Sequence, residues 1–354
     1  MSFLQSQTWI VLWQEKMRRG GAIDPMLQPS GILALALVGH PFIAFIDFDQ
    51  DPPALLPNPA QLPTVATWGG GIDWSPDGRF TAINEGTGTR VYDWASGAPV
   101  AVPNAVPANR VRQGLGWSTD GNYMGVTHHS GGAVTMLEHV GNGVFTLLPN
   151  LSPNPPGAGQ QIDWSPDARH FVVASDTGAA HLYNFEGPTP VAVAMNLVPG
   201  TAGTAATWTN DSRYFVIADN WAPPFIHLFD ITTGTPVRVP WNPPIGVLTT
   251  DVAFSPNNKY LAVARYANPG VHIYEWNPIA PVLKNFPIFN TLGQASGLGW
   301  SPNGRYLAVR HTPNANLAVF DWISGEPELV TNVPVVPGGR ARWGIAWRPQ
   351  KYKP

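Results

Sequence analysis

Short apolar runs of four to six residues, separated by Gly, Pro, Asn and Asp, make up the hydrophobic pattern of most of the chain. Residues 71–104 show one unit of this pattern: GIDW, the turn SPDG, RFTAIN, the loop EGTGT, RVYDW, ASG and APVAVPN. Runs of this length with β-branched and aromatic residues, bounded by turn formers, are typical of β-strands. The unit therefore predicts four short strands joined by tight connections.

The unit recurs along the chain in three registers. An aromatic residue precedes each turn at spacings of 43 to 47 residues: Trp74, Trp117, Trp164, Trp208, Phe254, Trp300 and Trp347. A bulky apolar residue followed by a polar one recurs at 45 or 46 residues: Ile46-Asp47, Tyr92-Asp93, Leu137-Glu138, Tyr183-Asn184, Phe229-Asp230, Tyr274-Glu275 and Phe320-Asp321. An Asn follows near the end of six units: Asn58, Asn104, Asn150, Asn196, Asn242 and Asn332. Four strands in such a period are typical of a β-propeller blade.

Seven units predict an all-β fold, a seven-bladed β-propeller of four-stranded antiparallel blades. The segments TRVYDW, FIHLFDI, GVHIYEW and NLAVFDW resemble the third-strand ends of WD40-type repeats. The WSPDGR-like openings are similar to those of WD40-like propellers such as the Tol-system propeller. This resemblance covers about residues 31–350 and is specific for fold rather than for function. The Gly-His pair of WD40 units is absent, so we do not expect their Asp–His–Ser/Thr–Trp hydrogen bonds.

The two ends of the chain predict how the ring closes. Trp347 belongs to a first strand with nothing after it, whereas GILALAL, FIAFIDF and PALLPN near the start supply a second, third and fourth strand. One blade built from both ends leaves no open sheet edge in the ring. We therefore predict a propeller over residues 31–354, preceded by an N-terminal arm, residues 1–30, as a possible docking segment.

Composition narrows the classes of function. The chain has no cysteine, which excludes disulfides, thiolate metal sites and Cys nucleophiles. Its net charge of −3 argues against partners held by bulk electrostatics, so we expect no nucleic acid and no membrane partner. No apolar run is long enough for a membrane helix, and the N-terminal charges follow the apolar residues, unlike in a signal peptide. We expect a cytoplasmic protein, or one assembled into a virus particle.

The SPDG segments match the position-by-position preferences of a β-turn, so we interpret them as structural. Gly78 suits a left-handed φ, but Ala168 and Ser212 do not, and we expect their hairpins to use another turn. The basic residue after each turn, such as Arg79, is expected to be solvated or paired locally, with Asp77 neutralising most of its charge.

Motifs that carry chemistry are weak or absent. DFDQD, residues 47–51, opens like a calcium loop but has Pro52 and Asn58 where an EF-hand needs Gly and Glu. His128 and His129 have no patterned acid nearby, and the sequence contains neither HExxH nor GxSxG. We therefore predict no enzyme activity, no catalytic residue, no metal and no cofactor.

Residues outside the repeat are the candidates for partner binding. Aromatic and Arg residues on exposed loops often dominate the binding energy of interfaces. The predicted contacts lie in the arm and on the propeller face that carries the longer loops: Trp9, Trp13, Trp221, Arg110, Arg112, Arg265, Tyr266, His311, Arg340 and Arg342. The alternative for each is local packing within its own loop.

The function that these observations favour is a non-catalytic propeller acting as a protein-interaction or structural subunit of an assembly. The partners would be other subunits, docked through the arm and the loop-rich face; a virion or phage-tail component is one assembly that fits the low charge and the missing cysteines. The alternative is a propeller that binds carbohydrate or a small ligand, with its extra Trp residues as stacking platforms. A third hypothesis, a metal enzyme that uses the central channel, lacks a repeated column of acid or His ligands.

Overall fold

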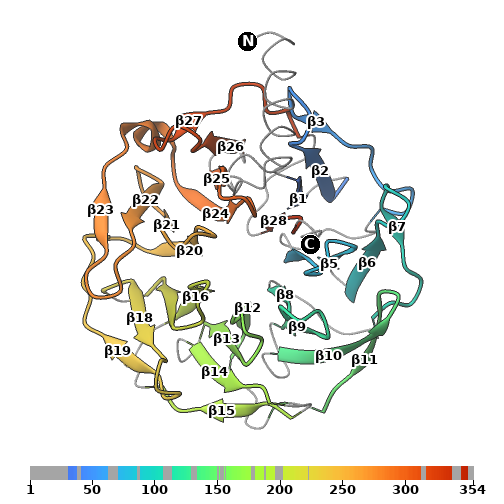
Figure 1. The fold of residues 1–354 in the computed structure, drawn as a ribbon, viewed down its shortest axis with the longest axis horizontal. Coiled ribbons are helices and arrows are strands. Elements are labelled where there is room, and N and C mark those ends of the chain that lie inside the picture. Colours follow the sequence, from blue (N-terminus) through green and yellow to red (C-terminus); the bar gives the residue numbers. More distant parts are fainter. Residues whose placement is uncertain are drawn as a thin grey trace, which may run out of the picture.

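Seven four-stranded sheets are arranged around a central axis as the blades of a propeller (Figure 1). The computed structural model describes residues 31–37, 41–62, 71–85, 88–106, 114–128, 134–149, 151, 155, 157–176, 180–186, 189–195, 202–221, 223–311, 316–336 and 344–349. Within these ranges no helix has the length and apolar character needed to cross a membrane. The predicted all-β, seven-bladed fold is confirmed.

Each blade is antiparallel, with its first strand innermost. Blade 1 consists of β28 (Ile345–Trp347), β1 (Ile32–Ala36), β2 (Ile43–Asp47) and β3 (Ala54–Leu55). Blade 2 has β4 (Ile72–Trp74), β5 (Phe80–Glu85), β6 (Gly88–Asp93) and β7 (Val100–Ala101). Blade 3 has β8 (Leu115–Trp117), β9 (Tyr123–Thr127), β10 (Val134–Gly141) and β11 (Val144–Leu147). Blade 4 has β12 (Gly159–Trp164), β13 (His170–Ser175), β14 (Ala180–Asn184) and β15 (Val191–Val193).

The remaining blades repeat this order. Blade 5 has β16 (Gly203–Trp208), β17 (Tyr214–Asp219), β18 (Ile226–Asp230) and β19 (Val237–Val239). Blade 6 has β20 (Thr249–Phe254), β21 (Tyr260–Arg265), β22 (Val271–Glu275) and β23 (Val282–Lys284). A short 3₁₀ helix, η2 (Pro287–Thr291), leads to blade 7, which has β24 (Ala295–Trp300), β25 (Tyr306–His311), β26 (Asn316–Asp321) and β27 (Glu328–Leu329).

The ring closes in blade 1, where strands from the two ends of the sequence pair. β28 lies antiparallel to β1, with Leu33 opposite Trp347 and Leu35 opposite Ile345. This confirms the closure predicted from the incomplete units. Pairing β28 with β1 leaves no inner gap in the ring, so the closing blade has the same four strands as the others.

The hydrophobic core lies between blades rather than inside them. Side chains alternate along each strand, so one set faces the preceding blade and the other faces the next one. In β21, for example, Leu261 and Val263 pack with residues of blade 5, whereas Ala262 and Ala264 pack with residues of blade 7. No blade can bury both faces without its two neighbours.

Except in blade 6, where Phe254 has no N–H to donate, the first strand ends in a Trp whose indole can join neighbouring blades through a hydrogen bond. The indole Nε1 of Trp164 donates to the carbonyl oxygen of Gly116 in the preceding blade at 3.2 Å, and that of Trp347 donates to Gly299 at 2.9 Å. The equivalent bonds at Trp74, Trp208 and Trp300 are each 3.3 Å long. Trp117 is the exception, because its Nε1 is buried without an acceptor.

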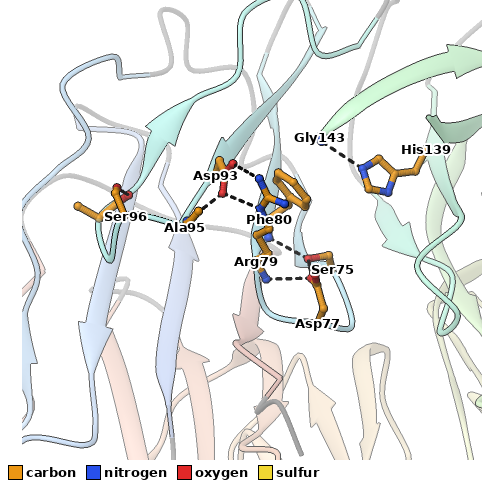
Figure 2. Close-up of polar contacts among 10 residues, drawn as sticks. Ser75, Asp77, Arg79, Phe80, Asp93, Ala95, Ser96, His139 and Gly143 are labelled. Atoms are coloured by element: carbon orange, nitrogen blue, oxygen red, sulfur yellow. Dashed lines mark hydrogen bonds and ion pairs between the residues drawn. The ribbon is translucent and has the colours of Figure 1, made fainter. Parts of the chain in front are cut away.

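The turn after each first strand is held by its own side chains. Ser75 Oγ donates to Asp77 Oδ1 at 2.6 Å, and the same carboxylate accepts the backbone N–H of Arg79 (Figure 2). The backbone N–H of Phe80 in turn donates to Ser75 Oγ. The same Ser/Thr-to-Asp/Asn bond occurs at five other turns, starting at Ser118, Ser165, Thr209, Ser255 and Ser301. These turns are structural, as predicted.

The prediction that two of these hairpins use another turn is wrong. Ala168 and Ser212 have φ values of 58°, the same left-handed conformation as Gly78 at 66°. The hydrogen bonds around the Ser/Thr and Asp side chains impose the turn, and this outweighs the cost of about 1–2 kcal/mol for a left-handed residue with a Cβ. The local preference of Ala for other conformations did not decide the turn type.

We expect Trp164→Phe to lower the free energy of unfolding by about 1 kcal/mol more than Trp117→Phe. The first change leaves the Gly116 carbonyl without its indole donor, whereas the second removes an N–H that has no acceptor. Both changes replace a buried indole by a smaller ring. The difference between their free energies of unfolding, measured by chemical denaturation, therefore gives the contribution of the hydrogen bond. Equal destabilisation would show that the inter-blade bond contributes nothing.

We expect Ala168→Gly to raise the free energy of unfolding by about 1 kcal/mol, because glycine adopts a left-handed φ without a Cβ clash. The reverse change, Gly78→Ala, should destabilise by more than this. Its new Cβ would lie 2.6 Å from the carbonyl oxygen of Pro349 in addition to the backbone strain. Thermal and denaturant unfolding of both variants tests the pair, and a destabilised Ala168→Gly would contradict the argument.

Candidate partner-binding face

The two ends of the propeller differ in the kind of connection they carry. The turns between first and second strands and between third and fourth strands lie at one end, which we call the turn face. The loops between second and third strands and the connections from one blade to the next lie at the other end, which we call the loop face. The predicted partner-binding residues that the structure describes, Trp221, Arg265, Tyr266 and His311, lie at the loop face.

Three exposed apolar side chains lie on the loop face of blades 5 and 6. Trp221, in the loop after β17, is 75% exposed, and Tyr266, in the equivalent loop after β21, is 53% exposed. Leu248, in the connection that enters β20, is 40% exposed. We call these three residues the aromatic patch. Sequence reasoning identified Trp221 and Tyr266 but missed Leu248, whose position in a long connection gave no signal.

Hydrogen bonds from buried groups hold the aromatic patch in place. The backbone N–H of Trp221 donates to Asp219 Oδ1 at 2.7 Å, and the backbone N–H of Asp219 donates to Thr249 Oγ1 at 3.0 Å. Next to Thr249, the carbonyl oxygen of Leu248 accepts the backbone N–H of Tyr266 at 3.0 Å. The backbones of the three exposed residues are therefore connected by hydrogen bonds across the boundary between the two blades.

A fully buried histidine next to Asp219 supports the same loop. His227 Nε2 lies 3.1 Å from Asp219 Oδ2, and neither side chain is exposed to solvent. The other carboxylate oxygen also accepts the backbone N–H of Ala202 at 3.3 Å. Asp219 thus connects the end of β17 to β18 and to the preceding connection, which fixes the base of the Trp221 loop.

The other described candidates do not extend the patch as exposed side chains. Arg265 is only 7% exposed, and its guanidinium donates to the carbonyl oxygens of Pro269 at 3.1 Å and Ile245 at 2.8 Å. His311 is half-buried at the end of β25, and burial lowers the pKa of its imidazole. Arg265 therefore shapes the loop that carries Tyr266, and a direct contact of either residue with a partner stays a prediction.

The remaining predicted contacts lie outside the described residues: Trp9, Trp13, Arg110, Arg112, Arg340 and Arg342. The proposed arm, residues 1–30, lies outside them as well. The division of the chain at residue 30 and the docking role of the arm therefore stay predictions.

Charge is distributed unevenly between the faces. The segments that connect strands on the loop face contain one acidic residue, Asp176, and four arginines: Arg110, Arg112, Arg340 and Arg342. On the turn face, by contrast, acidic side chains follow the third strands and occupy the turns. In sequence, these connections therefore carry a net positive charge although the whole chain has a net charge of −3, and the four arginines lie outside the described residues.

Two of the basic residues after the turns are paired locally, with a different partner from the one expected. Arg79 forms an ion pair of 2.8 Å with Asp93 at the end of the third strand, and its guanidinium covers the ring of Phe80 (Figure 2). Arg305 and Asp321 repeat this pair at 2.7 Å in blade 7. The turn carboxylates are used by the turn itself, so the third-strand acid neutralises the Arg.

Two weaker candidates from the sequence are used in local hydrogen bonds. In the DFDQD segment, Asp47 Oδ1 accepts the backbone N–H of Asp49, and Asp49 Oδ1 accepts that of Gly31. The imidazole of His128 is buried, with Nε2 2.7 Å from Thr135 Oγ1. Within the described ranges, no group of three or more His, Asp or Glu side chains is placed to hold a metal ion.

Carboxylates on innermost strands link neighbouring blades, a feature that the sequence reasoning missed. Asp73 Oδ2 accepts the backbone N–H of Trp117 at 2.9 Å, and Asp251 Oδ2 accepts that of Leu298 at 2.8 Å. Burial raises the pKa of both carboxyl groups to about 7, although the hydrogen bonds from these backbone N–H groups lower it. Burial raises the pKa of Asp163 as well, and the nearby Asp73 adds to the shift.

Comparison with known proteins identifies the fold. No family model matches the chain, and no curated protein matches it in sequence. The structure is similar to the propeller domain of Cps50 (Swd1) from Myceliophteria thermophila, with 14% identity, a TM-score of 0.59, and coverage of 83% of this chain and 92% of that one.

Two further solved structures show the same likeness. The periplasmic gluconolactonase PpgL of Pseudomonas aeruginosa has 14% identity and a TM-score of 0.62, over 88% of this chain and 97% of its own. A chain of the mitotic checkpoint complex has 17% identity and a TM-score of 0.60, over 78% of this chain and 83% of its own. At these identities the likeness defines the class of fold, a seven-bladed β-propeller of the kind found in WD40 proteins.

The prediction that the chain is not an enzyme is contradicted by this likeness. A gluconolactonase shares the fold over most of both chains, so the fold carries enzyme activity. The prediction relied on the absence of contiguous motifs such as HExxH. A propeller can instead bring single residues from several blades together at one face, where no local pattern marks them.

We expect the free energy of unfolding to fall between about pH 4 and pH 8 because of the inner-strand carboxyl groups. Their pKa of about 7 in the folded state lies above the ordinary value of 3.8, so the folded state binds these protons more tightly than the unfolded chain. Their contribution is complete below about pH 4 and is lost as the pH rises through 7, by up to about 4 kcal/mol for each group.

The variant Asp251→Gln tests this pH dependence without removing the link between blades. Gln161 occupies the equivalent position of blade 4, where its Oε1 accepts the backbone N–H of Ala206 at 3.0 Å. Denaturant unfolding from pH 4 to pH 8 should therefore show a shallower decline in the variant than in the parent. Identical pH profiles would contradict the assignment to Asp251.

Proposed function

We propose that the chain is a propeller subunit that binds a protein partner within a larger assembly, and that the aromatic patch is the centre of the contact. The observation that carries the proposal is Trp221, which is 75% exposed although its backbone is fixed by a buried carboxylate. An exposed side chain whose backbone is already held in place loses less entropy on binding than one on an unconstrained loop. Trp and Tyr are also enriched among residues that dominate interface energies.

The surroundings of the patch favour a partner with an apolar surface. The loops that carry it, residues 220–225, 240–248 and 266–270, contain no charged residue. Of the charged residues next to these loops in sequence, Asp219 and Arg265 are buried, and Arg238 in β19 is half-buried. A partner can therefore cover the patch without removing an exposed charge from water, which would oppose binding.

A contribution from residues 1–30 and a place in a virion or phage tail remain parts of the proposal that rest on the sequence alone. The apolar segment TWIVLW followed by QEKMRRGG supports a docking arm that a neighbouring subunit covers. Deletion of residues 1–20 should leave the propeller folded while reducing its incorporation into the native complex.

A second candidate function, binding of a carbohydrate, is favoured by the same pair of exposed rings. Trp221 and Tyr266 lie on equivalent loops of adjacent blades, an arrangement in which sugar rings could stack on their faces. Retention on a glycan array that is lost in Trp221→Ala would support this function over a protein partner.

We expect Trp221→Ala and Tyr266→Ala each to weaken association with the native partner at least tenfold, with no change in the melting temperature. Ile279→Ala is the matched control, because Ile279 is 80% exposed but lies in the turn between β22 and β23 on the turn face. The measurement is the yield of each co-purified protein, by quantitative mass spectrometry of the tagged chain from its native source. Equal loss in Ile279→Ala, or no loss in the patch variants, would contradict the proposal.

A further inference from the structure

Arg310 is a buried cation at the boundary between the last blade and the first. It lies near the loop-face end of β25, on the side of the strand that faces blade 1, and is only 2% exposed. Its Nη1 donates to the carbonyl oxygen of Ala36, at the end of β1, at 3.1 Å. Tyr306 and Ala308, on the same side of β25, pack against apolar residues of blade 1.

The guanidinium of Arg310 lacks a counter-charge in the part of the chain that the structure describes. It forms no ion pair with any described carboxylate, and its Nε is buried without an acceptor. Arg265, the other buried arginine nearby, donates instead to two carbonyl oxygens and contacts His272. A buried charge with a single described carbonyl partner is costly, because no ion pair with a described residue compensates for its lost hydration.

The segments that border this boundary cannot supply the missing anion. Residues 37–42, 312–315 and 330–344 connect the strands of blades 7 and 1 on the loop face, and their sequences contain neither Asp nor Glu. The connection that leaves blade 1, residues 56–71, contains none either. The acidic residues are also absent from residues 337–343, where the sequence has Arg340 and Arg342 outside the described residues.

One end of the guanidinium has no described partner. Its Nη2 donates no hydrogen bond to a described residue, and its Nε is buried without an acceptor. The residue opposite Arg310 on the innermost strand is Gly297, which has no side chain. The atoms nearest to a Cβ built at Gly297 are Ile345 Cδ1 and Cγ1 and Asp251 Oδ2, at 3.7 to 3.9 Å.

We propose that the loop-face end of the boundary between blades 7 and 1 binds a small anion with a phosphate or carboxylate group, and that Arg310 is its main contact. Phosphate and carboxylate oxygens match the forked geometry of a guanidinium and form its strongest hydrogen bonds. The anion would supply the negative charge that the described residues do not provide there. The site is separate from the aromatic patch, which lies on blades 5 and 6.

The electrostatics of Arg310 agree with this assignment. Burial lowers the pKa of its guanidinium to about 10, and no neighbouring carboxylate opposes the shift. The guanidinium remains charged at neutral pH, so the site keeps an uncompensated positive charge under the conditions in which a ligand would bind. A bound anion would neutralise the charge of Arg310, as Asp321 neutralises that of Arg305 in the same blade.

The test is the binding of inorganic phosphate and of malonate to the full chain, measured by calorimetry and by the shift of melting temperature. Sodium chloride at matched ionic strength serves as the reference. We expect saturable binding of at least one of the two anions in the parent protein, and the tighter of the two identifies the ligand group. Arg310→Gln should abolish the saturable response, and Arg310→Lys, which keeps the charge but not the fork, should weaken it about tenfold.

Arg213→Gln is the matched control, because Arg213 is an exposed residue of the turn face and its loss changes the net charge equally. This variant should bind the anion like the parent. Phosphate also stabilises folded proteins non-specifically, so the shift that remains in Arg310→Gln measures that background. If Arg310→Gln does not fold, the comparison of Arg310→Lys with the parent still decides the outcome.

Three results would overturn the proposal. The first is that neither anion binds above the chloride reference. The second is that Arg310→Lys binds the anion as tightly as the parent. The third is that a carboxylate of the chain itself supplies the counter-charge. Glu15 and Asp24 are the acidic side chains that lie outside the described residues. A double-mutant cycle between Arg310→Gln and Glu15→Gln with Asp24→Asn tests them, and strong coupling in unfolding free energy would assign the missing charge to the chain itself.

Discussion

The contact between neighbouring blades is the constraint on which the rest of this structure depends. A four-stranded blade has two apolar faces, and neither is covered until a second blade packs on each side. The hydrophobic core is therefore a series of interfaces around a ring, and it is complete only when β28 pairs with β1. The indole-to-carbonyl bonds and the inner-strand carboxylates act at these same interfaces, where they fix how one blade lies against the next.

Residues that repeat build the ring, and residues that do not repeat are left to carry function. The turn Ser and Asp, the first-strand Trp and the third-strand acid recur because each blade solves the same packing problem. Trp221, Tyr266 and Arg310 follow no repeat, and the burial of each is unusual for its residue type. Two are large apolar rings in water, and one is a charge with no counter-charge among the described residues.

Both kinds of departure lie on the loop face, and the architecture gives the reason. The turns of the other face are short and fully occupied in holding the hairpins, as the bonds of Ser75 and Asp77 show (Figure 2). The connections of the loop face are longer, so they can vary without disturbing a blade. The likeness to a gluconolactonase and to a chain of the mitotic checkpoint complex shows that one such scaffold supports unrelated activities.

The sequence by itself determined the blade count, the four strands of each blade and the shared closing blade, because repeated local patterns recur at a nearly constant period. It also marked Trp221 and Tyr266, since they fall outside that period. Only the tertiary structure decided the conformation of Ala168, the partner of Arg79 and the burial of Arg265 and Arg310. Each of these depends on a group distant in sequence or on a hydrogen-bonded turn, and no local preference of the residue itself encodes it.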